Sequence, residues 1–338
     1  MVWRLGRSRT VSSAAPAFNR TLTNRYCGSA LQTHEPAEFP QPSVTAVGAT
    51  LMRAVHTELD HPRLIQDPWG YRLLTNEDLD AFLAASLRFI PPRLREQLRH
   101  IPAREAVPIV ARRLPAYGMV IVRTHYTEEA LERAAAAGVH QYVVIGAGFD
   151  SFALRRPRFA EDIEIYEIDH PVTQALKRQR ISDAGLSPTG VHYIAADLTT
   201  EHVDVALARS SFDFARRAFC SCLGLMPYLS QDRSLAILAS IARCFAPASQ
   251  VVFTYLDAAA FERGDRERWR SRQTALTAIG EPWRSGFSPG KLEDELRGIG
   301  LQLLENMLSA DLRARYCTDR HDAISRSIGA NLARACVP

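Results

Sequence analysis

The sequence predicts an α/β protein, in which a mostly parallel sheet is flanked by helices. Three observations lead to this prediction: helical segments alone occupy residues 42–118, strand-sized apolar runs alternate with helices after them, and a glycine-rich turn follows the first of these runs. Strands that alternate with helices at this spacing pair in parallel, because each helix returns the chain to the same end of the sheet. The hydrophobic fraction of 46% and the charged fraction of 23% are typical of a folded globular protein.

Six segments have the composition of buried strands. They are rich in apolar, β-branched and aromatic residues, and they cover residues 141–150 with the glycine turn, 163–169, 191–197, 215–224, 250–256 and 301–307. Turn and capping residues mark the helices between them. We expect one helix from Thr127 to Gly138, a second from Pro171 to near Gly185, and a third that begins after Ser230.

The composition divides the chain into four parts. We expect residues 1–40 to be a disordered tail, 41–122 a helical cover, 123–310 an α/β domain with a helical insertion at 258–298, and 311–338 a C-terminal segment. Within the cover, apolar side chains recur at helical spacing and prolines interrupt the later segments. The arginine-rich, acid-poor tail also fits an organelle transit peptide or an over-extended start, and these alternatives stay open.

The formal net charge of +4 lies in the tail. Residues 1–34 contain five arginines and no acid, so the rest of the chain carries a charge near −1. A nucleic-acid-binding protein usually has a basic face in its folded part, so we expect no nucleic-acid partner. No stretch approaches the roughly 20 apolar residues of a membrane helix, so we expect no membrane partner either.

The six cysteines include no C-x-x-C pair. Cys220 and Cys222 lie two apart in a predicted strand and therefore point to the same face of the sheet. No second pair of cysteine or histidine residues lies at the ligand spacing of a zinc site, so we expect no metal. Scattered cysteines of this kind indicate reduced thiols and a cytoplasmic location.

The residues that follow the first three predicted strands carry the chemistry, because a ligand of an open α/β sheet binds beyond the carboxyl ends of the strands. The first strand ends in residues 146–151, where glycines let the backbone approach a ligand and the next helix presents free N–H groups. The second ends in Asp169, whose carboxylate can accept hydrogen bonds from both ribose hydroxyls. The third ends in Asp197 and Leu198, which suit the amine and the ring face of adenine. The three ends together predict a nucleoside cofactor.

The glycine turn distinguishes between two such cofactors. A dinucleotide-binding turn has the pattern G-x-G-x-x-G, and Ser151 stands at the third glycine position here. Asp150 would repel a pyrophosphate placed at the turn, whereas S-adenosylmethionine carries no phosphate and presents a sulfonium and an amino group. The residues therefore favour S-adenosylmethionine over a nicotinamide dinucleotide.

An ordered set of motifs extends this interpretation. The chain carries Arg123 with Thr124, the glycine turn and its flank at 146–155, E-x-D-x-P at 167–171 with Lys177, A-D-L at 196–198 and G-x-x-x-Y-L at 224–229. Upstream segments at 43–46, 53–54 and 67–68 belong to the same set. In these motifs the chain resembles the leucine carboxyl methyltransferase-like branch of the class I S-adenosylmethionine-dependent methyltransferases, whose fold is Rossmann-like.

The resemblance implies a role in binding S-adenosylmethionine for the residues that match. Arg123 would pair with the methionine carboxylate, and Gly146 would lie against the methionine portion. Asp169 would hold the ribose, and Asp197 and Leu198 would frame the adenine. The predicted cofactor-binding residues are Arg123, Gly146, Ala147, Gly148, Asp150, Asp169, Asp197 and Leu198.

Leu223 departs from the family pattern. Many members carry a glutamate there that helps hold the amino end of the cofactor, so we expect this contact to come from backbone carbonyls or from Asp150. Arg53 falls near a basic residue of the family that also reaches the cofactor. Lys177 matches the pattern, but we expect it to be a solvated helix residue.

These inferences together predict an O-methyltransferase that acts on a small molecule, with a carboxylate as the favoured acceptor. A carboxylate is ionised at neutral pH and needs no general base, and the motifs contain no obligatory catalytic histidine. We expect the acceptor pocket between the helical cover and the insertion at 258–298, with Tyr228, Tyr255 and Trp283 as candidate wall residues. A nicotinamide-dependent oxidoreductase and a non-catalytic cofactor-binding scaffold are the alternatives.

Overall fold

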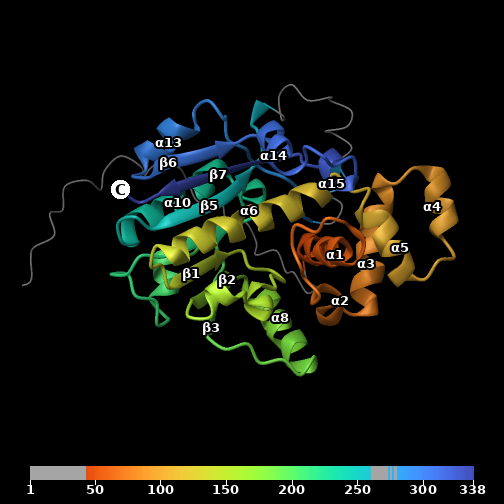
Figure 1. The fold of residues 1–338 in the computed structure, drawn as a ribbon, viewed down its shortest axis with the longest axis horizontal. Helices are drawn as coiled ribbons and strands as arrows, with labels where there is room; N and C mark the ends of the chain where they lie inside the picture. Colours follow the sequence, from red (N-terminus) through yellow and green to blue (C-terminus); the bar gives the residue numbers. More distant parts are fainter. Residues whose placement is uncertain (1–42, 260–272, 275, 278–279) are drawn as a thin grey trace, which may run out of the picture. The chain divides into compact units, whose positions relative to one another are not determined.

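A seven-stranded sheet organises the described part of the chain (Figure 1). The computed structural model describes residues 43–259, 273–274, 276–277 and 280–338. The strands are β1 Gln141–Ile145, β2 Glu164–Asp169, β3 Val191–Ala195, β4 Phe219–Cys222, β5 Gln250–Tyr255, β6 Gln302–Met307 and β7 Asn331–Cys336. Their order across the sheet is β3-β2-β1-β4-β5-β7-β6. Strands β1 to β5 are parallel, and β7 is antiparallel to both β5 and β6. The predicted mostly parallel sheet is confirmed.

Helices of the cover precede the sheet in the chain and gather at one end of its strands (Figure 1). They are α1 Val44–Leu59, α2 Gly70–Leu73, α3 Asn76–Ser86, the 3₁₀ turn η1 Leu87–Phe89, α4 Pro92–Leu98 and α5 Ala103–Ala111. The side chain of Ser43 caps α1, and Thr75 and Asp78 form a capping box on α3. The predicted disordered tail at 1–40 lies outside the described residues.

Helix α6 begins ten residues earlier than the sequence predicts. It runs from Tyr117 to Ala136, so Thr127 is a buried residue of its middle and not a cap. The prediction was wrong because the apolar residues before Thr127 continue the helix into the core, and burial of this face outweighs the local capping signal. Arg123 therefore lies on a helix that crosses a face of the sheet (Figure 1).

The remaining helices connect the strands or follow the sheet. They are α7 Phe152–Arg155, η2 Arg158–Ala160, α8 Pro171–Asp183, α9 Val203–Leu207, η3 Met226–Tyr228, α10 Gln231–Cys244, α13 Leu292–Gly298, α14 Ser309–Tyr316 and α15 Ala323–Arg326. Residues 260–272, 275, 278 and 279 of the predicted insertion lie outside the described residues. Among the described residues, no helix combines the length and the apolar character that crossing a membrane requires.

The C-terminal segment supplies a strand that the sequence does not predict. Strand β7 lies between β5 and β6, where Ala333 stands opposite Phe253 on one side and opposite Asn306 on the other. Its sequence, Asn-Leu-Ala-Arg-Ala-Cys, has few of the β-branched and aromatic residues that are enriched in strands. Pairing with two neighbouring strands, which sequence periodicity cannot reveal, therefore determines its structure.

The central strands are buried on both faces, which is why they are continuous apolar runs in the sequence. On β1, Tyr142 and Val144 belong to the core that includes residues of α6 and the cover, whereas Val143 and Ile145 belong to a second core that includes residues of α10. Cys220 and Cys222 both lie in this second core, so the prediction that they share a face is confirmed.

Replacing Gly118 by alanine should destabilise the fold. A Cβ on Gly118 would lie 2.1 Å from the carbonyl oxygen of Ile324, so α6 and α15 would have to move apart. Overpacking of this kind costs about 1–3 kcal/mol. We expect urea unfolding to give a free energy lower by that amount for Gly118→Ala. Gly298→Ala is the matched control, because no atom lies within 4 Å of the corresponding Cβ, and equal losses in the two variants would contradict the prediction.

Candidate cofactor-binding site

The glycine turn follows β1, the strand at which the strand order reverses: β2 and β3 lie on one side of it and β4 and β5 on the other. Strand β1 pairs with β2 on one side and β4 on the other, so a crevice opens at its carboxyl end. Gly146 and Gly148 have φ of +71° and +49°, a conformation that side chains disfavour. A Cβ on Gly146 would lie 3.2 Å from Leu225, and a Cβ on Gly148 would lie 3.1 Å from Ala46 of α1. Glycine at both positions therefore lets the backbone approach its neighbours, or a ligand, closely.

Asp169, at the end of β2, binds this turn directly. Its Oδ2 accepts a hydrogen bond from the backbone N–H of Gly148, and its Oδ1 accepts one from the N–H of His170 at 2.6 Å. Burial raises the pKa of Asp169, although both amides favour the charged form. Each carboxylate oxygen has two lone pairs, so capacity for further donors such as ribose hydroxyls remains.

Asp197 and Leu198 follow β3, the strand on the other side of β2. Burial opposes the ionisation of Asp197, but hydrogen bonds from the Thr199 side chain and backbone hold its pKa below its usual value. Leu198 is buried, and its carbonyl oxygen accepts a hydrogen bond from Nε of Arg233 at 2.5 Å. Because β1, β2 and β3 are adjacent and parallel, the three predicted strand ends lie at one edge of the sheet.

Arg123 approaches the turn from α6. A Cβ on Gly224 would lie 2.4 Å from its Nη1, so the missing side chain at Gly224 makes room for the guanidinium. Burial lowers the pKa of Arg123 to about 10, and repulsion from the charge of Arg53 contributes to the decrease. Tyr228 and Asp150 act in the opposite direction and raise the pKa. Among the described residues, the guanidinium of Arg123 makes no hydrogen bond or ion pair. Arg123 is partly buried, and a cation that is partly removed from water and has no partner gains from an anion, so an anionic group of a ligand would bind favourably there.

Arg53 connects the cover to the same turn. It is 4% exposed, its Nε binds Asp67 at 2.8 Å, and its Nη2 donates to the carbonyl oxygen of Phe149 at 2.9 Å. The hydroxyl of Thr50 donates to the same carbonyl at 3.1 Å. Ser151, which stands where a dinucleotide turn has its third glycine, donates from Oγ to Asp67 at 2.5 Å. The serine thus replaces the glycine for a structural reason that the sequence pattern alone does not give.

Lys177 is buried, and the prediction that it is a solvated helix residue was wrong. Its Nζ lies 2.5 Å from Oε2 of Glu167, and both side chains are 1% exposed. Glu167 points into the protein from β2, where burial raises its pKa, so a cation is needed to stabilise its charged form. The sequence spacing hides this pair because the two residues lie on different elements, β2 and α8.

Tyr228 marks the side of the turn where an acceptor could lie. Its hydroxyl donates to Oγ1 of Thr45 at 3.4 Å and is hydrogen-bonded by the side chain of Trp283, and burial raises its pKa. The hydroxyl and the N–H of Thr45 both donate to Oε2 of Glu281. The structure therefore brings together Tyr228 and Trp283, as predicted, with two residues that the sequence analysis missed. No local signal could have found Thr45 and Glu281, because they are 236 residues apart.

Tyr255 does not belong to this cluster, which corrects the prediction that it is a wall residue. It is fully buried, its hydroxyl donates to Oδ1 of Asn306 at 2.7 Å, and its ring packs edge-on against Phe287. Its position at the end of β5 suggested a site residue. Its side chain instead extends across β7 toward β6, a neighbour that the sequence does not reveal.

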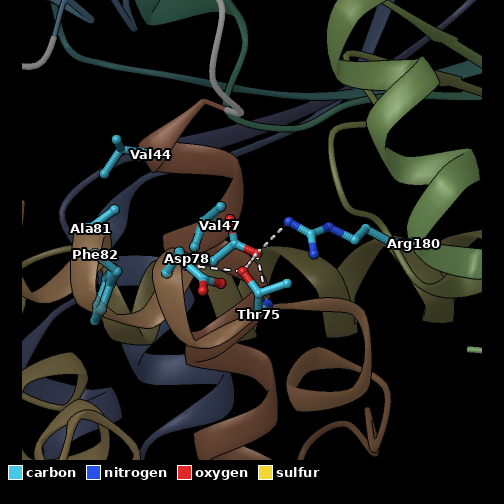
Figure 2. Close-up of a pocket in the computed structure, with 8 residues that line it drawn as sticks. Val44, Val47, Thr75, Asp78, Ala81, Phe82 and Arg180 are labelled. Atoms are coloured by element: carbon cyan, nitrogen blue, oxygen red, sulfur yellow. Dashed lines mark hydrogen bonds and ion pairs between the residues drawn. The ribbon is translucent and has the colours of Figure 1, made fainter. Parts of the chain in front are cut away.

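A cavity of about 390 Å³ lies among residues of α1, α3 and α8 (Figure 2). Its polar side contains Asp78, whose Oδ2 accepts a hydrogen bond from the N–H of Thr75 at 2.8 Å and pairs with Arg180 at 3.2 Å. Val44, Val47, Thr75, Glu77, Asp78, Ala81, Phe82 and Arg180 line it. None of the predicted cofactor-binding residues is among them, so we assign this cavity no part in the site.

Comparison with known proteins decides the family. The family model described as leucine carboxyl methyltransferase matches residues 46–242. The chain belongs to the leucine carboxyl methyltransferase family. It is 28% identical over 289 residues to YktD of Bacillus subtilis (strain 168), which is provisionally named an S-adenosyl-L-methionine-dependent methyltransferase, and the match covers 84% of this chain and 94% of YktD. A protein of Mycobacterium avium (strain 104) with the same provisional name is 29% identical over 240 residues, with 70% and 74% covered.

Solved structures with low sequence identity share the fold. A methyltransferase of Thermobifida fusca YX, named provisionally, has a TM-score of 0.52 and 16% identity, with 89% of this chain and 96% of that chain covered. A DUF574 family protein from Streptomyces avermitilis MA-4680 has a TM-score of 0.50 and 17% identity, with 84% and 100% covered. The class I methyltransferase fold is confirmed. The chain is a methyltransferase enzyme, and the prediction of S-adenosylmethionine as its cofactor is confirmed by the named relatives.

Replacing Gly224 by alanine should weaken the binding of S-adenosylhomocysteine, the product form of the cofactor. The new Cβ would displace the Arg123 guanidinium, and loss of one hydrogen bond to a charged group lowers affinity about tenfold or more. Gly185→Ala is the matched control, because Gly185 has a similar φ (+68° against +76°) but no atom within 4 Å. Calorimetric titration should show a raised Kd for Gly224→Ala alone. Equal Kd values in the two variants would contradict the assignment of Arg123 to the cofactor-binding site.

Proposed function

We propose that this enzyme transfers the methyl group of S-adenosylmethionine to an oxygen of a small molecule, with a carboxylate as the favoured acceptor. The observation that carries the proposal is the partly buried Arg123 guanidinium beside the glycine turn, with no hydrogen-bond or ion-pair partner among the described residues. It supports a site for the methionine carboxylate at this end of the crevice. Tyr228 interacts electrostatically with Arg123 and is hydrogen-bonded by Trp283, and beside these two residues we would place the acceptor.

The residues around the turn fit the cofactor part by part. Arg123 would hold the methionine carboxylate. Residues 146–148 would lie against the methionine chain, because Gly146 and Gly148 have positive φ and no side chain, which leaves the backbone accessible. Asp150, whose charge acts on Arg123, would attract the amino group, since Leu223 cannot. Asp169 would accept from the ribose hydroxyls, and residues 197–198 would bind the adenine edge and face.

S-adenosylmethionine supplies a methyl group that its sulfonium already activates. The protein's contribution is therefore to bind, to align the acceptor oxygen and to exclude water. Tyr228, partly buried and hydrogen-bonded to Thr45 and Trp283, is held in a position from which its hydroxyl could orient an acceptor. The backbone N–H of Arg284 donates to the carbonyl oxygen of Pro227 at 2.6 Å, which holds the Trp283 segment against η3.

The side chains near Tyr228 favour an acceptor that needs no general base. Burial raises the pKa of Tyr228, which keeps its hydroxyl protonated at neutral pH. Oε2 of Glu281 already accepts two hydrogen bonds from Thr45, so this oxygen is occupied as an acceptor. A carboxylate, with a reference pKa of about 4, is a nucleophile at pH 7 without proton removal, whereas an alcohol or phenol is not.

The sequence also leaves two other functions open, a nicotinamide-dependent oxidoreductase and a non-catalytic cofactor-binding scaffold. The comparisons give no support to a nicotinamide-dependent oxidoreductase, and the bond from Ser151 to Asp67 occupies the place where a dinucleotide turn needs glycine. A non-catalytic scaffold would bind the cofactor but transfer no methyl group to any acceptor. A small-molecule acceptor and a cytoplasmic location stay predictions from the sequence.

The pH dependence of methyl transfer should identify the acceptor group. We expect transfer of labelled methyl from S-adenosylmethionine to members of a panel of small carboxylic acids, with a rate that changes little between about pH 6 and pH 8.5 because the acceptor is ionised throughout. Matched alcohols and phenols serve as controls. A rate confined to hydroxyl acceptors that rises with pH would contradict carboxylate methylation, and binding of S-adenosylhomocysteine without transfer to any acceptor would favour the scaffold.

A further inference from the structure

Asp67 lies between α1 and α2 and is fully buried. Its Oδ2 accepts hydrogen bonds from Nε of Arg53 at 2.8 Å and from Oγ of Ser151 at 2.5 Å. Its Oδ1 accepts one from the backbone N–H of Trp69 at 3.1 Å. One carboxylate of the cover therefore binds both a helix of the cover and the residue that directly follows the glycine turn.

The two partners of Asp67 act at two different residues of the turn and its flank, Phe149 and Ser151. Arg53 donates from Nη2 to the carbonyl oxygen of Phe149 at 2.9 Å, inside the turn. Ser151 accepts at 3.0 Å from Nε of Arg155, whose guanidinium is fixed by an ion pair with Glu128 of α6 at 2.6 Å. The backbone between Phe149 and Ser151 is thus positioned by a chain of charged side chains, and Asp67 is the member that joins its two halves.

Asp67 also balances charge next to Arg123. Burial opposes its ionisation, but Arg53, Arg155 and the hydroxyl of Ser151 hold its pKa below the usual value, so it is anionic at neutral pH. Arg53 acts electrostatically on Arg123, and this repulsion is part of what lowers the pKa of Arg123. Without the negative charge on Asp67, Arg53 would be a buried cation free to move relative to both Arg123 and the carbonyl of Phe149.

We propose that Asp67 is a positioning residue for the methionine half of the cofactor, acting through Arg53 and Ser151 on the glycine turn. The proposal rests on the assignment of Arg123 and residues 146–148 to that half, made above. Asp67 does not touch the cofactor. We expect its effect to be larger at the methionine end of the crevice. Asp169 contacts the turn through Gly148, but its other oxygen is held by His170, and neither Asp169 nor Asp197 makes a hydrogen bond with Asp67, Arg53 or Ser151 among the described residues.

The test compares two ligands that share the nucleoside. S-adenosylhomocysteine carries the amino-acid portion, and 5′-methylthioadenosine lacks it. Replacing Asp67 by asparagine keeps the shape and removes the charge, and we expect calorimetry to show an affinity for S-adenosylhomocysteine lower by about 10–100-fold, as for a lost charge-assisted hydrogen bond. The affinity for 5′-methylthioadenosine should change less than about twofold. A merely structural role would lower both affinities together.

Asp60→Asn is the matched control. Asp60 is also a buried carboxylate of the cover with an arginine partner, Arg112 at 2.8 Å. Its other partners, His56 and Tyr117, make no hydrogen bond with residues 146–151 among the described residues. We expect this variant to have a lower Tm and unchanged affinities for both ligands. If Asp67→Asn does not fold, Ser151→Ala removes one hydroxyl from the same carboxylate and should produce a smaller but equally selective loss.

Three results would overturn the inference. Equal losses of the two ligands in the Asp67 or Ser151 variant would show a general structural role, and unchanged affinity for S-adenosylhomocysteine would show no role at all. Wild-type protein that binds 5′-methylthioadenosine and S-adenosylhomocysteine equally well would contradict the assignment of the methionine half itself, and this outcome separates failure of the proposed site from failure of the positioning role.

Discussion

The carbonyl oxygen of Phe149 joins the helical cover to the glycine turn, and the site depends on this junction. A buried carbonyl must be hydrogen-bonded, and in the turn no neighbouring strand can supply the donor. Helix α1 supplies two donors, the hydroxyl of Thr50 and the guanidinium of Arg53. The same helix places Ala46 against Gly148. The cover is therefore part of the ligand site, since the turn has its observed conformation only while α1 is packed against it.

Several charged side chains lie close to this junction, and their pairing determines which of them stabilise the fold and which can bind a ligand. Arg53 has a partner in Asp67, and Arg155 has one in Glu128. Removing one partner of a buried pair costs about 3–5 kcal/mol, so these pairs hold the turn firmly. Arg123 is different, because it has no hydrogen-bonded partner among the residues that the structure describes. The protein thus presents one cation to a ligand and keeps the others for its own structure.

The sequence predicts well those features that depend on neighbouring residues. Residues 141–145 are predicted as a strand because a strand with both faces buried is a continuous apolar run. The glycine turn, Asp169 and Asp197 follow three strands that the α/β pattern predicts to be neighbours. Features that depend on residues distant in the sequence are not predicted. Lys177 pairs with Glu167, which is buried on a strand, and Glu281 accepts hydrogen bonds from Thr45 in the first turn of α1. Neither contact leaves a local sequence pattern.

The same distinction explains the errors in the secondary structure. Strand β7 is poor in strand-forming residues and forms because β5 and β6 bind it on both sides. Helix α6 extends N-terminally past Thr127 because its first turns are buried in the core. In both cases tertiary burial outweighs local propensity, and a single sequence contains no direct signal of it.

A crystal structure of the complex with S-adenosylhomocysteine would test the central claim most directly, namely that the cover and the turn together form the site for the amino-acid end of the cofactor. We predict the ligand carboxylate within hydrogen-bond distance of the Arg123 guanidinium, with the ribose hydroxyls at Asp169 and the cover in place over Phe149. A ligand whose carboxylate lies in solvent, or whose binding leaves Arg123 turned away from it, would contradict this account.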